Sequence, residues 1–193
     1  MRRLTTWICS FLLLAMILLC TSQSVIAQKT NQFISATAMG TSTQLGRVVS
    51  IDLRIFEYSP AADQAVLMEA FRADGSQGLA NALDKMSSKG RMAITGTIGY
   101  DVNYIRKFIQ PDGTEIIRFV TDRPVRFGEA WASTRSMDYN ISLLQIVVKK
   151  GGSKGQITGT LMPAVLPKLT KSGELEIEAY QNPWNLTNIK FHK

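Results

Sequence analysis

From residue 91 to its end, the chain is a succession of short apolar stretches separated by turn residues. These stretches recur about every 8 to 15 residues, and chains of this kind typically form antiparallel sandwiches or barrels. The predicted strands cover residues 92–98, 100–110, 114–121, 138–150, 156–162, 174–180 and 184–191. Together with one earlier strand, they predict a mainly β fold (α+β), an antiparallel sandwich or barrel of about eight or nine strands.

The earlier strand is the clearest one, because apolar and polar side chains alternate strictly over residues 49–55. A helix should follow it, with Ser59 as the N-cap and Pro60 at the first helical position. The triplet Asp74-Gly75-Ser76 interrupts the apolar period, and a second amphipathic helix should run on to Gly90. We therefore predict a two-helix insertion at about 60–88, directly after the first strand.

Two local patterns within the β region predict irregular strands. The apolar face of segment 138–150 changes sides near Leu143 or Gln145, which indicates a bulge. Pro163 and Pro167 lack the backbone N–H of a strand ladder, so we expect them to interrupt the strand that begins at residue 156.

A third pattern predicts which face of a late strand is buried. In segment 174–180, Leu175, Ile177 and Ala179 alternate with three glutamates. We expect the apolar set to be buried and the glutamates, at 174, 176 and 178, to face water.

Residues 1–27 have the pattern of a secretory signal peptide. Arg2 and Arg3 precede an apolar run over residues 7–20, and Val25-Ile26-Ala27 supplies small residues for cleavage. The run is shorter than a spanning helix requires, so the mature form should have no transmembrane anchor. Both cysteines lie inside this segment. The predicted localisation is exported, either periplasmic or extracellular, and the mature domain must fold without disulfides.

The remaining chain divides into a lead-in and one domain. Residues 28–42 are rich in Thr, Ser, Ala and Gln and have no sustained apolar period, which predicts a flexible lead-in. Residues 43–193 should form a single β-rich domain, since no composition shift or linker divides them.

The charge of the chain favours anionic partners. The net charge is +7, and residues 90–193 hold 14 basic against nine acidic side chains, whereas residues 28–89 are balanced. Such a field suits a small anionic ligand or an anionic envelope surface, although an ordinary solubilising surface has the same composition. We expect no nucleic-acid partner.

Histidine and cysteine are too scarce for the commonest catalytic and metal chemistry. His192 is the only histidine, and it lies one residue from the end of the chain. A Ser-His-Asp triad and a zinc site are therefore disfavoured, and we expect no metal and no cofactor. Carboxylates remain, notably Asp101, Asp122 and Asp138, and two of them in one cleft would allow glycoside hydrolysis. The alternative is that they form surface ion pairs.

One segment combines arginines with aromatic side chains. A guanidinium can bind an anion through two hydrogen bonds while it stacks on a ring. The candidate ligand-binding residues are Arg118, Arg123, Arg126, Trp131 and Arg135. The structural alternative is that Asp122 pairs with a neighbouring arginine at a strand end and that the aromatic residues belong to the core.

A second basic group surrounds the glycine-rich turn at 151–155. Lys149, Lys150 and Lys154 should form a solvated hairpin tip that contacts an anionic surface, or that pairs across strands with the glutamates of segment 174–180. The phosphate-loop pattern is not satisfied, since no GKS or GKT sequence closes the glycine run.

Two resemblances follow from these segments. Gly99-Tyr100-Asp101-Val102-Asn103-Tyr104, Thr121-Asp122-Arg123-Pro124 and Ser136-Met137-Asp138-Tyr139 resemble segments of exported bacterial proteins without an assigned activity. That resemblance spans about 43–190 and implies an envelope or secreted setting. The order of a strand, two helices and a strand meander is similar to the fatty-acid-binding proteins, in which helices cover a barrel.

Three functions remain open at this point. The first is a noncatalytic secreted or periplasmic binding domain for an apolar or anionic small ligand. The alternative is an envelope structural or interaction module that docks a partner through an edge strand or the basic turn. The third is a carboxylate-dependent hydrolase.

Overall fold

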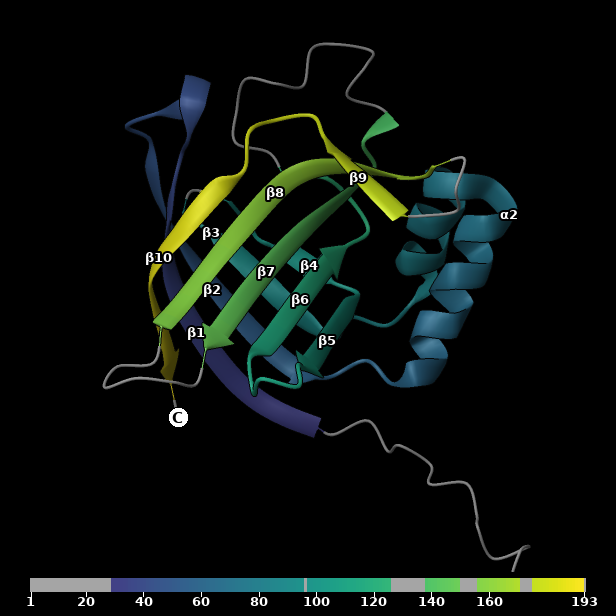
Figure 1. Ribbon diagram of the computed structural model, residues 1–193, viewed down its shortest axis with the longest axis horizontal. Coiled ribbons are helices and arrows are strands. Elements are labelled where there is room, and N and C mark those ends of the chain that lie inside the picture. Colours follow the sequence, from purple (N-terminus) through teal and green to yellow (C-terminus); the bar gives the residue numbers. More distant parts are fainter. Residues whose placement is uncertain (1–28, 96, 126–137, 150–155, 171–174, 193) are drawn as a thin grey trace, which may run out of the picture.

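The structure is a computed structural model of the 193-residue chain, and it describes residues 29–95, 97–125, 138–149, 156–170 and 175–192. Within these ranges ten strands form one mostly antiparallel sheet that curls into a nearly closed barrel, with one helical element beside it (Figure 1). Of the two architectures predicted, the barrel is therefore the correct one. The predicted signal peptide lies outside the described residues. None of the described helices is long and apolar enough to cross a membrane.

The sheet order is β4-β3-β2-β1-β10-β8-β7-β6-β5, and every pairing is antiparallel. The first strands are β1 (Lys29–Met39), β2 (Val48–Glu57), β3 (Gly90–Ile94), β4 (Tyr100–Val102) and β5 (Tyr104–Ile109). The later strands are β6 (Glu115–Thr121), β7 (Ile141–Lys149), β8 (Gln156–Leu169), β9 (Leu175–Ala179) and β10 (Trp184–His192). A short 3-10 turn, η1 (Ser42–Gln44), lies between β1 and β2.

The barrel closes at a corner of the chain at Asn103. β4 and β5 are the two ends of the sheet order, yet they are consecutive in sequence and separated only by this residue. The amide N–H of Asn103 donates to the carbonyl oxygen of Val120 on β6 at 3.1 Å. Across this single residue the chain therefore stops pairing with β3, the partner of β4, and starts pairing with β6, the partner of β5.

The predicted lead-in is wrong for most of its length. Residues 28–42 include β1, which lies at the centre of the sheet between β2 and β10. Ile34, Ala36 and Ala38 alternate toward the barrel interior and are at most 5% exposed. Small and hydroxylated residues hide this alternation in the sequence, and the long-range pairing with two neighbouring strands is what orders the segment.

The helical insertion is a single element, α2 (Ala61–Lys85). Its backbone departs from helical geometry at Asp74 and Gly75, where the sequence predicted a break between two helices, and Gly75 has φ of 55°. The N-cap residue is Pro60, and no side chain caps the helix. Ser59, the predicted N-cap, instead accepts a hydrogen bond from the buried N–H of Ile105 through its Oγ.

The strands β5 to β8 contribute side chains to an apolar cluster on each face of the sheet. Ile105, Phe119, Leu144 and Leu161 belong to the interior cluster of the barrel. Their sequence neighbours Tyr104, Val120, Leu143 and Met162 belong instead to a second cluster with Leu67, Ala80 and Leu83 of α2. Because side chains alternate across a strand, α2 covers the outer face of the sheet. The fatty-acid-binding arrangement, with helices over the barrel interior, is therefore not followed, and none of the described α2 residues joins the interior cluster.

Irregularities of β7 and β8 occur together. The β7–β8 register shifts between Ile141 and Leu143, as the bulge prediction expected. β8 continues through both prolines, contrary to the prediction, because Pro163 lies in this shift and needs no ladder donor. Its carbonyl oxygen accepts instead from the N–H of Val125 at 2.8 Å and from the Ser142 hydroxyl at 2.5 Å.

The burial predicted for β9 is wrong. This strand pairs only with β8 among the described strands, so no layer covers its apolar side. Ile177 is 42% exposed and Ala179 is exposed, as are the two glutamates between and beside them. The side chains of Glu174 and Leu175 lie outside the described part of the chain.

The position of β1 generates a stability prediction. Replacing the fully buried Ile34 with alanine should lower the free energy of unfolding by about 3 kcal/mol, since it leaves a cavity between β2 and β10. Asn31→Ala on the same strand, at an exposed side chain, should change it by less than about 0.5 kcal/mol. Urea denaturation of both variants gives the two values. Equal, negligible effects would mean that residues 29–39 are a loose tail after all.

Candidate functional site

The outer face of β5 to β8 carries three rows of side chains that cross the strands. The row nearest α2 is apolar and consists of Tyr104, Val120, Leu143 and Met162, each directly opposite the next. The middle row is polar and consists of Arg106, Arg118, Gln145 and Thr160. The third row consists of Phe108, Ile116, Val147 and Thr158. We refer to the middle one as the arginine row.

Two like charges face each other directly in the arginine row. Arg106 on β5 and Arg118 on β6 are a register pair on the same face of the sheet. A like-charge pair at this position is destabilising by a few tenths to about 1 kcal/mol. Neither side chain forms an ion pair with any acidic residue in the described part of the chain.

Phe108 and Gln145 hold the two guanidinium groups in place. The Cζ atoms of Arg106 and Arg118 lie 5.6 and 5.2 Å from the centroid of the Phe108 ring. The Nε of Arg118 donates to Oε1 of Gln145 at 2.9 Å, which leaves the end of that guanidinium for another partner. Nη1 of Arg106 is buried and has no hydrogen-bond partner, a situation that costs about 1–3 kcal/mol for a polar group. The site therefore has donors in excess of acceptors.

Tyr104 adds a neutral donor beside the arginines. Burial raises the pKa of its hydroxyl above the ordinary value, and Arg106 and Arg118 only partly offset this by lowering it. The hydroxyl therefore stays protonated at neutral pH and can donate a hydrogen bond to an anion.

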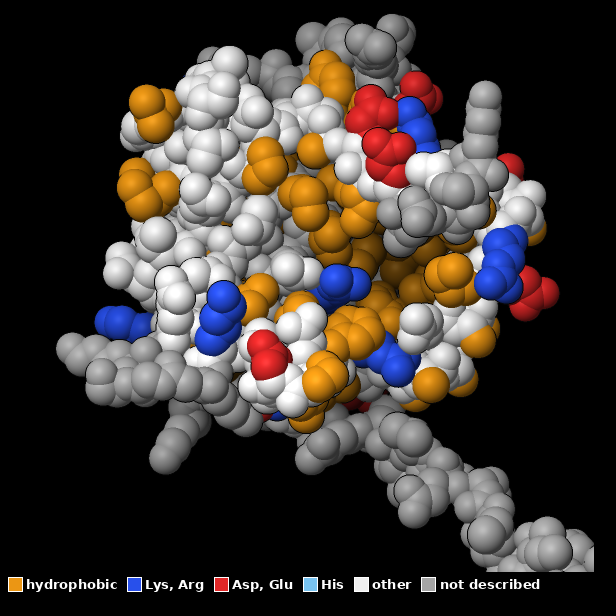
Figure 2. All heavy atoms as spheres, in the orientation of Figure 1, with side chains coloured by type: hydrophobic (Ala, Val, Ile, Leu, Met, Phe, Trp, Pro, Cys, Tyr) orange, Lys and Arg blue, Asp and Glu red, His pale blue; other side chains and the backbone are white. Residues whose placement is uncertain are grey.

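An apolar hollow adjoins the arginine row. Figure 2 shows it between the sheet and α2, with a hydrophobic floor and with Lys or Arg side chains at its rim. The side chains that are only partly buried in the cluster between α2 and the sheet are Leu79, Ala82, Met86, Val120, Leu143 and Met162. Apolar surface is thus available within one row of the two arginines.

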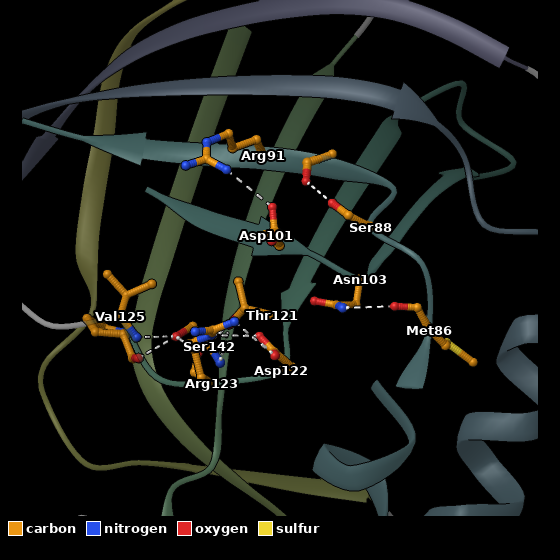
Figure 3. Close-up of polar contacts among 12 residues, drawn as sticks. Met86, Ser88, Arg91, Asp101, Asn103, Thr121, Asp122, Arg123, Val125 and Ser142 are labelled. Atoms are coloured by element: carbon orange, nitrogen blue, oxygen red, sulfur yellow. Dashed lines mark hydrogen bonds and ion pairs between the residues drawn. The ribbon is translucent and has the colours of Figure 1, made fainter. Parts of the chain in front are cut away.

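The residues that flank α2 at both ends are hydrogen-bonded to the corner between β4 and β5. At its start, the N–H of Ser59 donates to the carbonyl oxygen of Ile105 at 2.6 Å. At its end, Nδ2 of Asn103 donates to the carbonyl oxygen of Met86 at 3.2 Å, as Figure 3 shows. These bonds fix the distance between α2 and the strands that carry the arginines.

A buried lysine also ties the first turn of α2 to the barrel. Nζ of Lys89 lies 2.5 Å from Oε1 of Glu57 at the end of β2 and 3.7 Å from Oδ2 of Asp63 in α2. The Lys89 side chain is 11% exposed, whereas the side chain of Lys168, which pairs with Glu178, is 50% exposed. Removing the Lys89 charge therefore costs more than removing that of Lys168, because the carboxylates beside Lys89 are partly buried and would be left unpaired.

A third set of bonds holds the ends of β6, β7 and β8 together (Figure 3). The Thr121 hydroxyl donates to the carbonyl oxygen of Arg123 at 2.5 Å and accepts from the N–H of Ser142 at 3.1 Å. The Ser142 hydroxyl accepts from the N–H of Val125 at 2.7 Å. These buried hydroxyls satisfy backbone groups where β6 ends and β7 begins.

The ligand-binding residues predicted from sequence do not all gather at one place. Arg118 lies in the arginine row, whereas Arg123 follows β6 and forms two hydrogen bonds with its neighbour Asp122, at 3.1 and 3.3 Å. The hydrogen bonds to Asp122 raise the pKa of Arg123, consistent with the structural alternative for this arginine. Arg126, Trp131 and Arg135 lie outside the described residues. Sequence reasoning missed Arg106 and Tyr104, although the short turn at 111–113 fixes the register that brings Arg106 opposite Arg118.

The other candidate residues have ordinary partners. Asp101 pairs with Arg91 at 3.4 Å (Figure 3), and Asp122 pairs with Arg123. Asp138 is exposed. Lys149 is exposed at the end of β7, and Lys150 and Lys154 lie outside the described residues. Glu178 pairs with Lys168 and accepts a hydrogen bond from Tyr139, so its partner lies within the β8–β9 hairpin rather than at the basic turn.

His192 lies within β10 and contacts two residues of β1. Its ring lies 4.9 Å from that of Phe33, and its Nε2 is 2.8 Å from the hydroxyl of Ser35. The sheet register places Asp52 opposite Ser35, while His192 is opposite Phe33. Among the described residues, no three His, Cys, Asp or Glu side chains are grouped so as to hold a metal ion.

Comparison of the chain with protein-family models, with curated proteins and with solved structures found no match.

The Lys89 cluster generates a prediction about the support of α2. Lys89→Met should lower the free energy of unfolding by about 2–3 kcal/mol, because it leaves the partly buried carboxylates of Glu57 and Asp63 without their cation. The matched variant Lys168→Met, at an exposed pair, should cost less than about 1 kcal/mol. Both values follow from urea denaturation at pH 7, and equal costs would refute a special role for Lys89.

Proposed function

We propose that this protein is a noncatalytic, secreted or periplasmic binding domain whose ligand is a small amphipathic anion. The head of the ligand, a carboxylate or a phosphate, would bind Arg106 and Arg118. Its apolar chain would occupy the hollow between the sheet and α2. The secreted or periplasmic setting follows from the signal-peptide pattern of residues 1–27.

The observation that carries this proposal is the pair of directly opposed arginines without a described acidic partner. A protein tolerates such a pair when something offsets the repulsion, and an anion bound between the two guanidinium groups does so. The orphaned Nη1 of Arg106 supports the same reading, because a buried donor requires an acceptor. Phe108 and Gln145 hold the groups before a ligand arrives, which lowers the entropic cost of binding.

The apolar surface next to the arginine row determines the kind of anion. A small inorganic ion would use the arginines alone and would gain nothing from the hollow. A ligand that also buries an apolar chain gains about 0.8 kcal/mol for each buried CH₂ group. The proximity of both features therefore favours an amphipathic molecule such as a single-chain fatty acid or alkyl phosphate.

Calorimetry with dodecanoate below its micelle concentration tests this proposal. Arg106→Gln and Arg118→Gln should each weaken binding about tenfold, because each removes a charge-assisted hydrogen bond of about 1.4 kcal/mol. Arg54→Gln is the matched control: its guanidinium also lies over a phenylalanine ring, 5.9 Å from that of Phe33, but on strand β2. This variant should bind dodecanoate as the unmodified protein does.

Two other probes separate the contributions of head and chain. Acetate, which has the head alone, and dodecyltrimethylammonium, which has the chain with the opposite charge, should each bind at least about tenfold more weakly than dodecanoate. Absence of dodecanoate binding, or equal losses in the three arginine variants, would refute the proposal.

A further inference from the structure

Four exposed hydrophobic side chains gather at one end of the barrel. Met39 and Val48 form the last register pair of the β1–β2 hairpin and are 44% and 56% exposed. Leu45, in the turn between these strands, is 81% exposed, and Ile98, in the β3–β4 turn, is 93% exposed. β2 and β3 pair from Ile51 and Ile94 onward, so the two turns lie at the same end of the barrel. We call these turns and their four side chains the hairpin end.

The hairpin end projects beyond its neighbouring strands. The ladder between β1 and β10 ends at Met39. Beyond it, two side chains hold the turn to the segment before β10: the Thr41 hydroxyl donates to the carbonyl oxygen of Pro183 at 2.6 Å, and Nε2 of Gln44 donates to Oε1 of Gln181 at 3.3 Å. In Figure 1 the β1–β2 hairpin stands out at the upper left, and in Figure 2 hydrophobic side chains protrude in the same place. Four of the ten large hydrophobic side chains that are exposed among the described residues are therefore on one protruding feature. A scattered surface distribution does not account for this.

Four backbone N–H groups of the projecting turn donate within the turn itself. The N–H of Gly40 donates to the carbonyl oxygen of Arg47, and the N–H of Arg47 donates to that of Gln44. The N–H groups of Gln44 and Leu45 donate to the carbonyl oxygens of Thr41 and Ser42. Insertion into an apolar environment is costly for a loop with free amide groups. The four internal bonds lower that cost for this turn, and one of them is made by the N–H of Leu45 itself.

The charge of the hairpin end matches an anionic lipid surface. Residues 39–50 and 92–99 contain no Asp or Glu, and Arg47 lies two residues from Leu45. A membrane interface attracts surfaces that combine exposed apolar side chains with basic ones and that bring no carboxylate against the headgroups.

We propose that the hairpin end docks the protein on an anionic lipid surface, with Leu45 and Ile98 inserted among the headgroups and acyl chains. This inference is independent of the proposed ligand site, because the hairpin end and the arginine row share no residue. It identifies the partner as a bilayer surface rather than as another protein.

Cosedimentation with vesicles of phosphatidylcholine and phosphatidylglycerol in equal parts tests the proposal. Leu45→Asp should lower the partition coefficient of the protein at least about tenfold, and Ile98→Asp should have a similar effect, because a carboxylate replaces an inserted apolar group. The matched control is Ile109→Asp. Its side chain is 70% exposed but belongs to the last residue of β5, at the opposite end of the barrel (Figure 1), and the change should alter partitioning less than twofold.

Each alternative gives a different result. If the basic turn were the contact, Lys149→Glu would abolish partitioning while Leu45→Asp would leave it unchanged, and the proposal would fall. If the hairpin end joined two copies of the chain, light scattering would show a dimer that Leu45→Asp dissociates, without vesicle binding by the original protein. Circular dichroism checks that each variant is folded. We expect all of them to fold, because the substituted side chains are exposed. Dodecanoate calorimetry on the same samples reports on the ligand site separately.

Discussion

The four residues from Val102 to Ile105 are the constraint on which the rest of the structure depends. Val102 and Ile105 both point into the barrel although three positions separate them, so the strict alternation of a strand breaks here. The extra residue lets the chain exchange β3 for β6 as its partner and so brings the barrel near to closure. The same corner forms hydrogen bonds with the residues at both ends of α2. The same four residues therefore determine both how the barrel approaches closure and where α2 lies.

That placement divides the outer face of the sheet into a covered part and an open part. Under α2 the strands carry apolar side chains, and one row farther on they carry two opposed arginines beside Phe108. The boundary between apolar burial and solvated charge is where an amphipathic ligand gains from both. Like charges directly opposite each other lower the stability of the free protein, and the proposed anion would offset this loss, so stability and binding would oppose each other at this row.

The strands that sequence predicted best are those with a local pattern, such as β2 with its strict alternation and the β5–β6 hairpin around residues 111–113. Predictions failed where a distant partner decides the outcome. β1 is ordered by β2 and β10, although its own composition suggests a tail. β9 has an alternating pattern but no layer to cover Ile177. For the site, sequence pointed to Arg118, whereas Arg106 becomes relevant only through the register. The apolar period of α2 indicates which side is buried but not which face of the sheet it meets.

A double-mutant cycle on Arg106 and Arg118 tests the central claim most directly. The free energy of unfolding is measured at low ionic strength for the unmodified protein, Arg106→Gln, Arg118→Gln and the double variant. If the arginines repel each other, the double variant loses about 0.5 kcal/mol more stability than the two single losses combined. Saturating dodecanoate should reverse the sign of this coupling, because one anion then binds both groups. Additive losses, or an attractive coupling in the free protein, would contradict the account.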